Sequence, residues 1–120
     1  MTNIEIYDQI IIELSNFKFN RNSIAYEYLI DAIFIVTKNR IAIKDFNYYV
    51  YSKIGQRYRT KPQNVLWCIS KLINLMYINT DENIISDYFK INVEERLSTK
   101  AFINGISRNI IKKVEILTIK

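Results

Sequence analysis

Residues 46–77 read FNYYVYSKIGQRYRTKPQNVLWCISKLINLMY, and the rest of the predicted architecture is arranged around them. The first half ends near Ile54 and Gly55, and a small residue such as this glycine suits a place where two helices cross. From Val65 onward, apolar residues recur at helical spacing. The stretch therefore predicts two helices joined by a short turn, which is typical of a helix-turn-helix whose second helix enters the major groove of DNA.

The start of the second helix carries two signals. Thr60 and Gln63 have the spacing of a capping box, in which each side chain bonds a free backbone amide near the helix start. Pro62 lies in the first turn, where its missing N–H costs little. We therefore expect Thr60 to cap this helix.

At 100° per residue, the second helix has two distinct faces. The apolar face collects Val65, Leu66, Cys68, Ile69, Leu72, Ile73, Leu75, Met76 and Tyr77. The opposite face carries the amide, hydroxyl and ammonium groups that read base edges, together with Asn74 and a tryptophan. The candidate base-reading residues are Gln63, Asn64, Trp67, Ser70 and Lys71.

Positive charge is concentrated in the middle of the chain. The net charge is +5, but binding of nucleic acid requires clustered charge. Residues 36–77 have a balance of plus seven, from eight basic residues and one acidic residue, whereas 1–35 and 78–99 each have minus three. The tail 100–120 has plus four and is a candidate second contact. The candidate phosphate contacts lie near the turn: Lys53, Arg57, Arg59, Thr60 and Lys61.

Length and composition favour one folded, mainly helical domain over residues 1–120. The chain is 49% hydrophobic, with only two glycines and one proline. No apolar run approaches the roughly 18 residues of a membrane span, and no signal peptide is evident. We expect a cytoplasmic protein that does not bind membranes, and the abundance of residues with AT-rich codons suggests a bacterial source.

The residue types that support most enzyme and metal chemistry are scarce. The chain has one cysteine and no histidine, which excludes an internal disulfide and the usual zinc sets and removes the commonest general base. Cys68 falls on the apolar face and is expected to be a core residue. We therefore expect no enzymatic activity, no catalytic residues, no cofactor and no metal.

Two helices are predicted before residue 46. Thr2 and Glu5 have capping-box spacing, and the first helix has an apolar face of Ile4, Tyr7, Ile11 and Leu14. The loop 15–22 contains Phe17 and Phe19, which need cover. Ser23 caps the second helix, which extends to about Thr37 with Ala25, Leu29, Ala32, Ile33 and Val36 facing inward.

The polar, basic connection 38–45 leads into the third helix. The third and fourth helices are the two predicted within residues 46–77, and two further helices follow them. The third helix faces inward with Phe46, Tyr49, Val50 and Ile54. Thr80 with Asn83 opens the fifth helix, and 90–97 forms a charged loop. Ser98 or Thr99 caps the sixth, whose apolar stripe is Phe102, Ile103, Ile106 and Ile110. The pattern Val114, Ile116, Leu117, Ile119 fits either a frayed helix or a short strand. The fold class is all-α, with six helices.

The run Ala25, Tyr26, Tyr28, Leu29, Asp31, Ala32 and Ile33 looks like Gly-Tyr-x-Tyr-Leu-x-(Glu/Asp)-Ala-Ile. Further matches are Tyr51, Ile54, Gly55, Thr60, Val65, Ile69, Ile85, Ser86, Phe89, Phe102 and Ile103. In order and spacing, these residues resemble the C-terminal DNA-binding domain of the stage-zero sporulation master response regulator of spore-forming bacteria. The resemblance implies a six-helix domain that binds an AT-rich promoter element, often as tandem dimers, and activates or represses transcription.

The chain departs from that family in two respects. The family carries a receiver domain, whose phosphorylated aspartate relieves inhibition, before this domain. This chain starts at the DNA-binding part, so we expect its activity not to depend on phosphorylation. The family's recognition helix also has Glu and Arg after the valine and Arg after the isoleucine, where this chain has Leu66, Trp67 and Ser70. We therefore expect a different target sequence, with Trp67 contacting DNA or anchoring a subunit contact.

Three functions fit these observations. The first is a transcriptional regulator of the sporulation type. The second is an accessory or architectural DNA-binding factor that assists recombination, such as excision of a mobile element. The third is a protein-interaction module that has lost DNA binding and docks through Leu66 and Trp67. The expected partners are double-stranded DNA, a second copy on DNA, and RNA polymerase or a recombinase.

Overall fold

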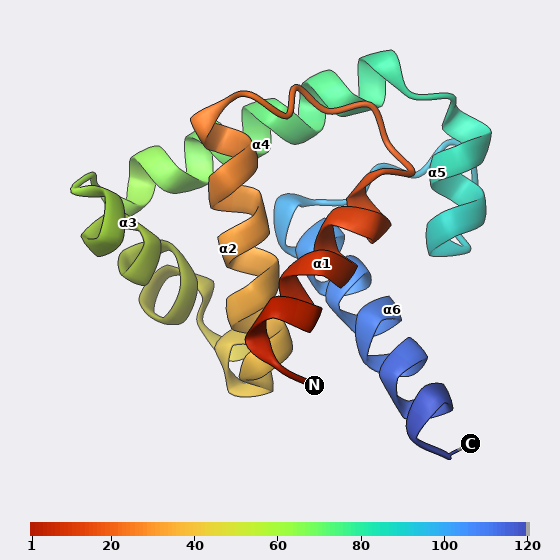
Figure 1. Ribbon diagram of the computed structural model, residues 1–120. Coiled ribbons are helices and arrows are strands. Elements are labelled where there is room, and N and C mark those ends of the chain that lie inside the picture. The colour runs from red at the N-terminus through yellow and green to blue at the C-terminus, as the bar shows by residue number, and fades with distance from the viewer. Residues whose placement is uncertain (120) are drawn as a thin grey trace.

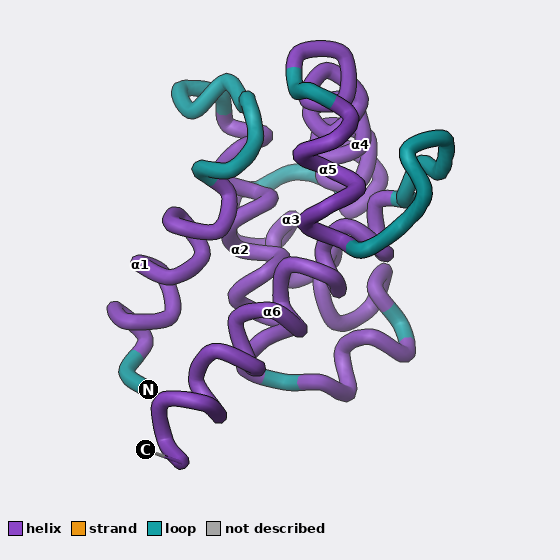
Figure 2. Tube along the Cα trace, turned by 90° about the vertical axis from the view of Figure 1, so that its right-hand side faces the viewer, coloured by secondary structure: helices purple, strands orange, loops and turns teal. Residues whose placement is uncertain are grey.

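Helices connected by loops make up the whole of the chain that the computed structural model describes, which is residues 1–119 with side chains through residue 114 (Figures 1 and 2). The α-helices are α1 Asn3–Leu14, α2 Ile24–Lys38, α3 Ser52–Tyr58, α4 Pro62–Asn79, α5 Glu82–Phe89 and α6 Thr99–Ile119. A short 3-10 helix, Arg40–Lys44, and a π-helical turn, Asn47–Tyr51, precede α3. The all-α prediction with six α-helices is confirmed.

Helix α2 is at the centre of the molecule and packs against α1, α4 and α6 (Figure 1). Its inward residues Leu29, Ala32, Ile33 and Val36 have no exposed surface. α2 is surrounded by other helices because its apolar residues cover more than one face. No helix among the described residues is long and apolar enough to cross a membrane.

An aromatic cluster holds α5 and the loop 15–22 against the helical core. The Phe17 ring is buried and lies 5.8 Å from Phe89 and 5.5 Å from Phe102, between ring centroids. Phe89 and Phe102 are 5.2 Å apart. A Cβ on Gly105 would lie 2.6 Å from the Phe89 ring, so the glycine allows α5 to approach α6. Phe17 is covered, as predicted, and Phe19 is half-buried.

A buried carboxylate joins α1 to α5 and α6. Glu13 is only 1% exposed and accepts hydrogen bonds from the Tyr88 hydroxyl at 2.7 Å and from Lys113 Nζ at 2.6 Å. Gln9 Nε2 donates a third bond at 2.9 Å. Burial raises the pKa of Tyr88, and the nearby Glu13 carboxylate adds to the shift, so the hydroxyl remains a donor.

The buried face of α1 differs from the predicted one. Ile4 is 73% exposed and Ile11 45% exposed, whereas Ile6 and Ile10 are buried with Leu14. The predicted stripe is wrong at Ile4 and Ile11, because α1 is apolar on several sides. Apolar spacing alone does not show which side meets α2 and α6.

Most helix starts agree with the predictions. The Thr2–Glu5 capping box forms, with both backbone-to-side-chain bonds present. Ser23 and Ser98 each accept a hydrogen bond from the amide three residues later. These side chains satisfy amides that have no partner within the helix.

The start of α5 was predicted wrongly. Asp81, not Thr80, caps this helix by accepting a bond from the N–H of Asn83 at 2.8 Å. Thr80 instead ends α4, and its hydroxyl accepts a bond from the N–H of Lys18 at 2.9 Å. A tertiary contact thus uses the hydroxyl that the spacing assigned to a cap.

The C-terminal segment forms one helix. The backbone of α6 is helical through Ile119, so the strand alternative is wrong. The predicted stripe Phe102, Ile103, Ile106 and Ile110 is fully buried, as expected. The side chains of Ile116, Leu117 and Ile119, and the whole of Lys120, lie outside the described residues.

Tyr88, with Tyr51 as a control, provides a test of the Glu13 contacts. Tyr88→Phe removes a donor from a buried carboxylate and should lower the free energy of unfolding by about 1.5–3 kcal/mol. Tyr51 Oη is buried and has no hydrogen-bond partner among the described residues, and burial raises the pKa of Tyr51 to about 12. Tyr51→Phe should therefore be neutral or stabilising. Urea unfolding of both variants measures the difference, and equal losses would contradict this account.

Candidate nucleic-acid interface

A tight turn joins α3 to α4. Arg59 adopts the left-handed conformation, with φ 56° and ψ 48°, and the N–H of Thr60 donates to the carbonyl of Gly55 at 2.8 Å. This pattern is a Schellman closure of α3. A Cβ on Gly55 would lie 2.5 Å from the carbonyl oxygen of Thr60, so only glycine fits without a shift. The sequence predicts a crossing of two helices at Gly55, and the backbone that Gly55 approaches is that of the turn and of the first residue of α4.

Helix α4 begins one residue later than the predicted capping box requires. Pro62 is its first residue, as expected in the first turn, and Lys61 occupies the cap position without a side-chain bond to the helix. The Thr60–Gln63 capping box is wrong. Since Thr60 lies outside the helix, its hydroxyl accepts a bond from Asn64 Nδ2 at 2.9 Å instead. The start of α4 retains its partial positive charge beside Arg59 and Lys61.

Four of the five candidate base-reading residues share one exposed face of α4. Gln63, Asn64, Trp67 and Lys71 are all exposed, Trp67 by 61%. Lys71 Nζ lies 5.1 Å from the centre of the Trp67 ring, a cation–π contact. The arrangement places an aromatic surface, a cation and two amides together on the side of α4 away from the core.

The fifth candidate, Ser70, lies against another helix. Its hydroxyl is 2.7 Å from the Thr99 hydroxyl at the start of α6, and the side chain is half-buried. The opposite, apolar face of α4 agrees with the prediction except at Leu75, which is 48% exposed. Cys68 is half-buried and packs against the core, as expected.

The candidate phosphate contacts divide into two groups. Arg59, Thr60 and Lys61 form the turn directly before α4. Lys53 and Arg57 lie one turn apart on α3 and line a cavity of about 210 Å³ that also touches α1 and α2. The structure therefore does not bring all five together.

An ion pair explains the position of Arg57. Its Nη1 lies 3.3 Å from Asp31 Oδ2 on α2, and the Tyr58 hydroxyl donates to the same oxygen at 3.0 Å. Burial raises the pKa of Asp31, although the Tyr58 bond and the Arg57 charge act in the opposite direction. Burial and the Asp31 carboxylate raise the pKa of Tyr58 to about 12. These contacts fasten α3 to α2.

The sequence pattern predicts no role for Asp31 or Tyr58. The available signal was an acidic residue beside the inward positions of α2, where an unpaired carboxylate is costly. The partner could not be identified from spacing, because Tyr58 lies 27 residues further along the chain.

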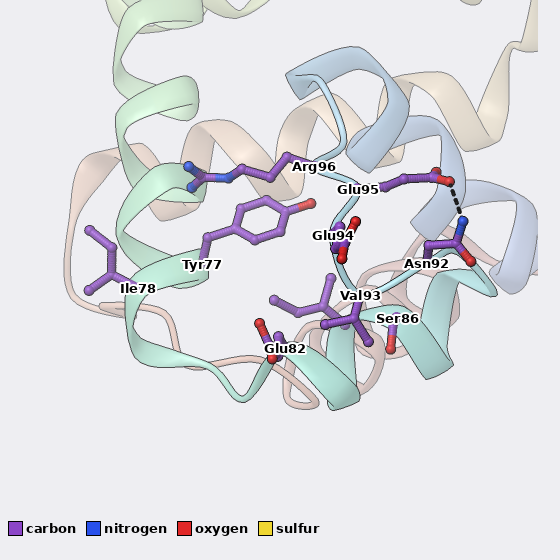
Figure 3. A pocket seen from close by; sticks show the side chains of 10 residues that line it. Tyr77, Ile78, Glu82, Ser86, Asn92, Val93, Glu94, Glu95 and Arg96 are labelled. Atoms are coloured by element: carbon purple, nitrogen blue, oxygen red, sulfur yellow. Dashed lines mark hydrogen bonds between the residues drawn. The ribbon is translucent and has the colours of Figure 1, made fainter.

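A separate cavity of about 340 Å³ lies between the end of α4, α5 and the loop after α5 (Figure 3). Glu82, Glu94 and Glu95 line it, and the Arg96 guanidinium lies over the Tyr77 ring, 4.6 Å from its centre. The three carboxylates make this cavity an unfavourable place for a phosphate group. Among the described residues, no group of three possible metal ligands is present.

Comparison with known proteins gives one match. The family model described as "Sporulation initiation factor Spo0A C terminal" matches residues 10–110. No curated protein and no solved structure matches the chain. The family model covers most of the chain, including the turn between α3 and α4. The chain therefore belongs to the family of the C-terminal domain of the sporulation initiation factor Spo0A, a family of DNA-binding domains.

Proposed function

We propose that this chain, as a single domain, binds duplex DNA with α4 in the major groove and regulates transcription as a sporulation-type effector. The observation that carries the proposal is the exposed face of α4, with Gln63, Asn64, Trp67 and Lys71 directly after a basic turn. Membership of a DNA-binding family supports it. Ser70 would reach a base only by giving up its contact with Thr99.

Phosphate contacts would form around the turn. Arg59, Lys61 and the N–H groups at the start of α4 provide positive charge where a DNA backbone flanking the major groove would pass. Lys53 adds charge on α3. Arg57 contributes mainly by holding α3 on Asp31, since a phosphate would have to compete with that ion pair.

An accessory role in recombination is the second candidate. It is favoured by Trp67, which exposes a large ring and one N–H and therefore makes no bidentate guanine contact. Genomic footprinting separates the candidates, because a regulator occupies several promoters and a recombination factor one attachment site. A transcriptional regulator would act with a second copy on DNA and with RNA polymerase. A recombination factor would act with a second copy on DNA and with a recombinase.

Salt dependence tests the backbone contacts. If about five phosphates are neutralised, log affinity should fall against log salt with a slope of about −4 to −5. Fluorescence anisotropy with a labelled duplex measures the slope between 50 and about 200 mM salt. No binding at low salt would favour the protein-interaction alternative.

Arg59→Gly separates DNA binding from stability. Glycine removes the left-handed strain, worth about 1 kcal/mol, so the melting temperature should rise or stay unchanged while DNA affinity falls. Lys90 has the same φ of 56° at the end of α5 and the same type of closure. Lys90→Gly is the matched control for the gain in melting temperature. Unchanged DNA affinity of Arg59→Gly would exclude Arg59 as a phosphate contact.

Trp67 and Leu66 should respond differently to truncation. Trp67→Ala should weaken DNA binding about tenfold, or about 1.4 kcal/mol, with little change in melting temperature, because the ring is exposed. Leu66 is half-buried against the core, so Leu66→Ala should cost about 1 kcal/mol of stability. Selection from a randomised duplex pool, with melting curves, measures both effects.

The double variant Leu66→Glu with Trp67→Arg tests sequence preference in the same selection. It restores the charged residues of the family that the chain resembles, so the selected sequences should move toward guanine-containing elements. If Trp67→Ala binds DNA like the wild type and changes the oligomeric state, Trp67 is a subunit contact instead.

A further inference from the structure

A second basic site lies at the other end of the molecule from the α3–α4 turn. A cavity of about 220 Å³ between the end of α5 and the middle of α6 is lined by Lys90, Arg108 and Lys112, and Asn109 also lines it. No carboxylate lines this cavity among the described residues. The charge therefore contrasts with that of the cavity lined by Glu82, Glu94 and Glu95.

The backbone brings the three cations together. Arg108 and Lys112 are four residues apart on α6 and so project from one side of the helix. Lys90 follows α5 in the left-handed conformation. Gly105, which has no side chain, lets Phe89 and the end of α5 lie directly on α6 beside them.

These cations are available to a ligand. All three are exposed, and the two ion pairs of the described residues use Arg57 and Lys113 instead. Lys113 lies beside Lys112 in sequence but donates to the buried Glu13. Three exposed cations around a small polar hollow fit a phosphodiester group, which has one negative charge and several acceptor oxygens.

We propose that Lys90, Arg108 and Lys112 bind the phosphate backbone of DNA outside the segment that α4 contacts. The inference rests on the proposed DNA binding by α4. Figure 1 shows α3 at the left and α5 at the right, so the two basic regions are far apart on a molecule that extends 40 × 34 × 27 Å. The phosphates then belong to flanking DNA on the same duplex or to a second duplex.

The test uses Arg108→Gln with Lys112→Gln in the full chain. The matched control is Lys18→Gln with Arg21→Gln, which removes the same two charges from the loop 15–22. Binding is measured on a duplex of about 12 base pairs and on one of about 40 base pairs, one and nearly four helical turns. A bridging assay measures capture of a labelled duplex by an immobilised one, and melting curves confirm folding.

The Arg108/Lys112 variant should bind the short duplex like the wild type. If the bound phosphates belong to flanking DNA on the same duplex, affinity for the long duplex should fall about tenfold. The salt slope should then become less steep by about two. If a second duplex is the source, bridging should be lost. The control should retain long-duplex affinity, salt slope and bridging.

Three results would overturn the inference. If the Arg108/Lys112 variant keeps the long-duplex affinity, the salt slope and the bridging of the wild type, the second site is excluded. The proposed DNA binding by α4 is not affected by that result. An equal loss in the variant and the control would show an effect of net charge only. Absence of binding by the wild-type protein to either duplex would overturn both this inference and the proposed function.

Discussion

The close approach of the Thr60 carbonyl to Gly55 fixes how α4 leaves α3. A side chain at Gly55 would push the turn away by forcing apart atoms that would otherwise be 2.5 Å from each other. The direction of α4 in turn decides which of its residues meet α2 and which remain exposed. The exposure of the polar face with Trp67 therefore depends on this backbone contact as well as on the burial of the apolar face on the other side of the helix.

The pair α3–α4 is held on the core by polar contacts as well as by apolar packing. Asp31 accepts bonds from both Arg57 and Tyr58, so consecutive residues at the end of α3 are tied to α2. A half-buried ion pair contributes little net stability when desolvation is included, but it restricts the geometry. We infer that its main effect is to set the orientation of α3, and thereby the position of the basic turn.

The sequence was sufficient for the helix content, the turn at Gly55 and most of the apolar face of α4, because these depend on local spacing. It was insufficient where tertiary contacts decide. Thr60 and Thr80 have cap-like spacing, yet each hydroxyl bonds a different group. Ile4 and Ile11 match a helical stripe, but α1 packs through its neighbouring face. Helical spacing predicts Ser70 on the base-reading face, because its hydrogen-bond partner, Thr99, lies 29 residues further along the chain and leaves no local signal.

The contact between Glu13 and Lys113 has a consequence for synthesis of the protein. The two residues are 100 positions apart, so the carboxylate meets its ammonium partner only after the hundred residues that follow it have been synthesised. Until Lys113 has emerged from the ribosome, a nascent chain therefore cannot bury Glu13 with its full set of donors, and α1 should complete its packing only together with α6. Helix α1 is synthesised before α2 to α5, yet it reaches its final packing no earlier than α6 does.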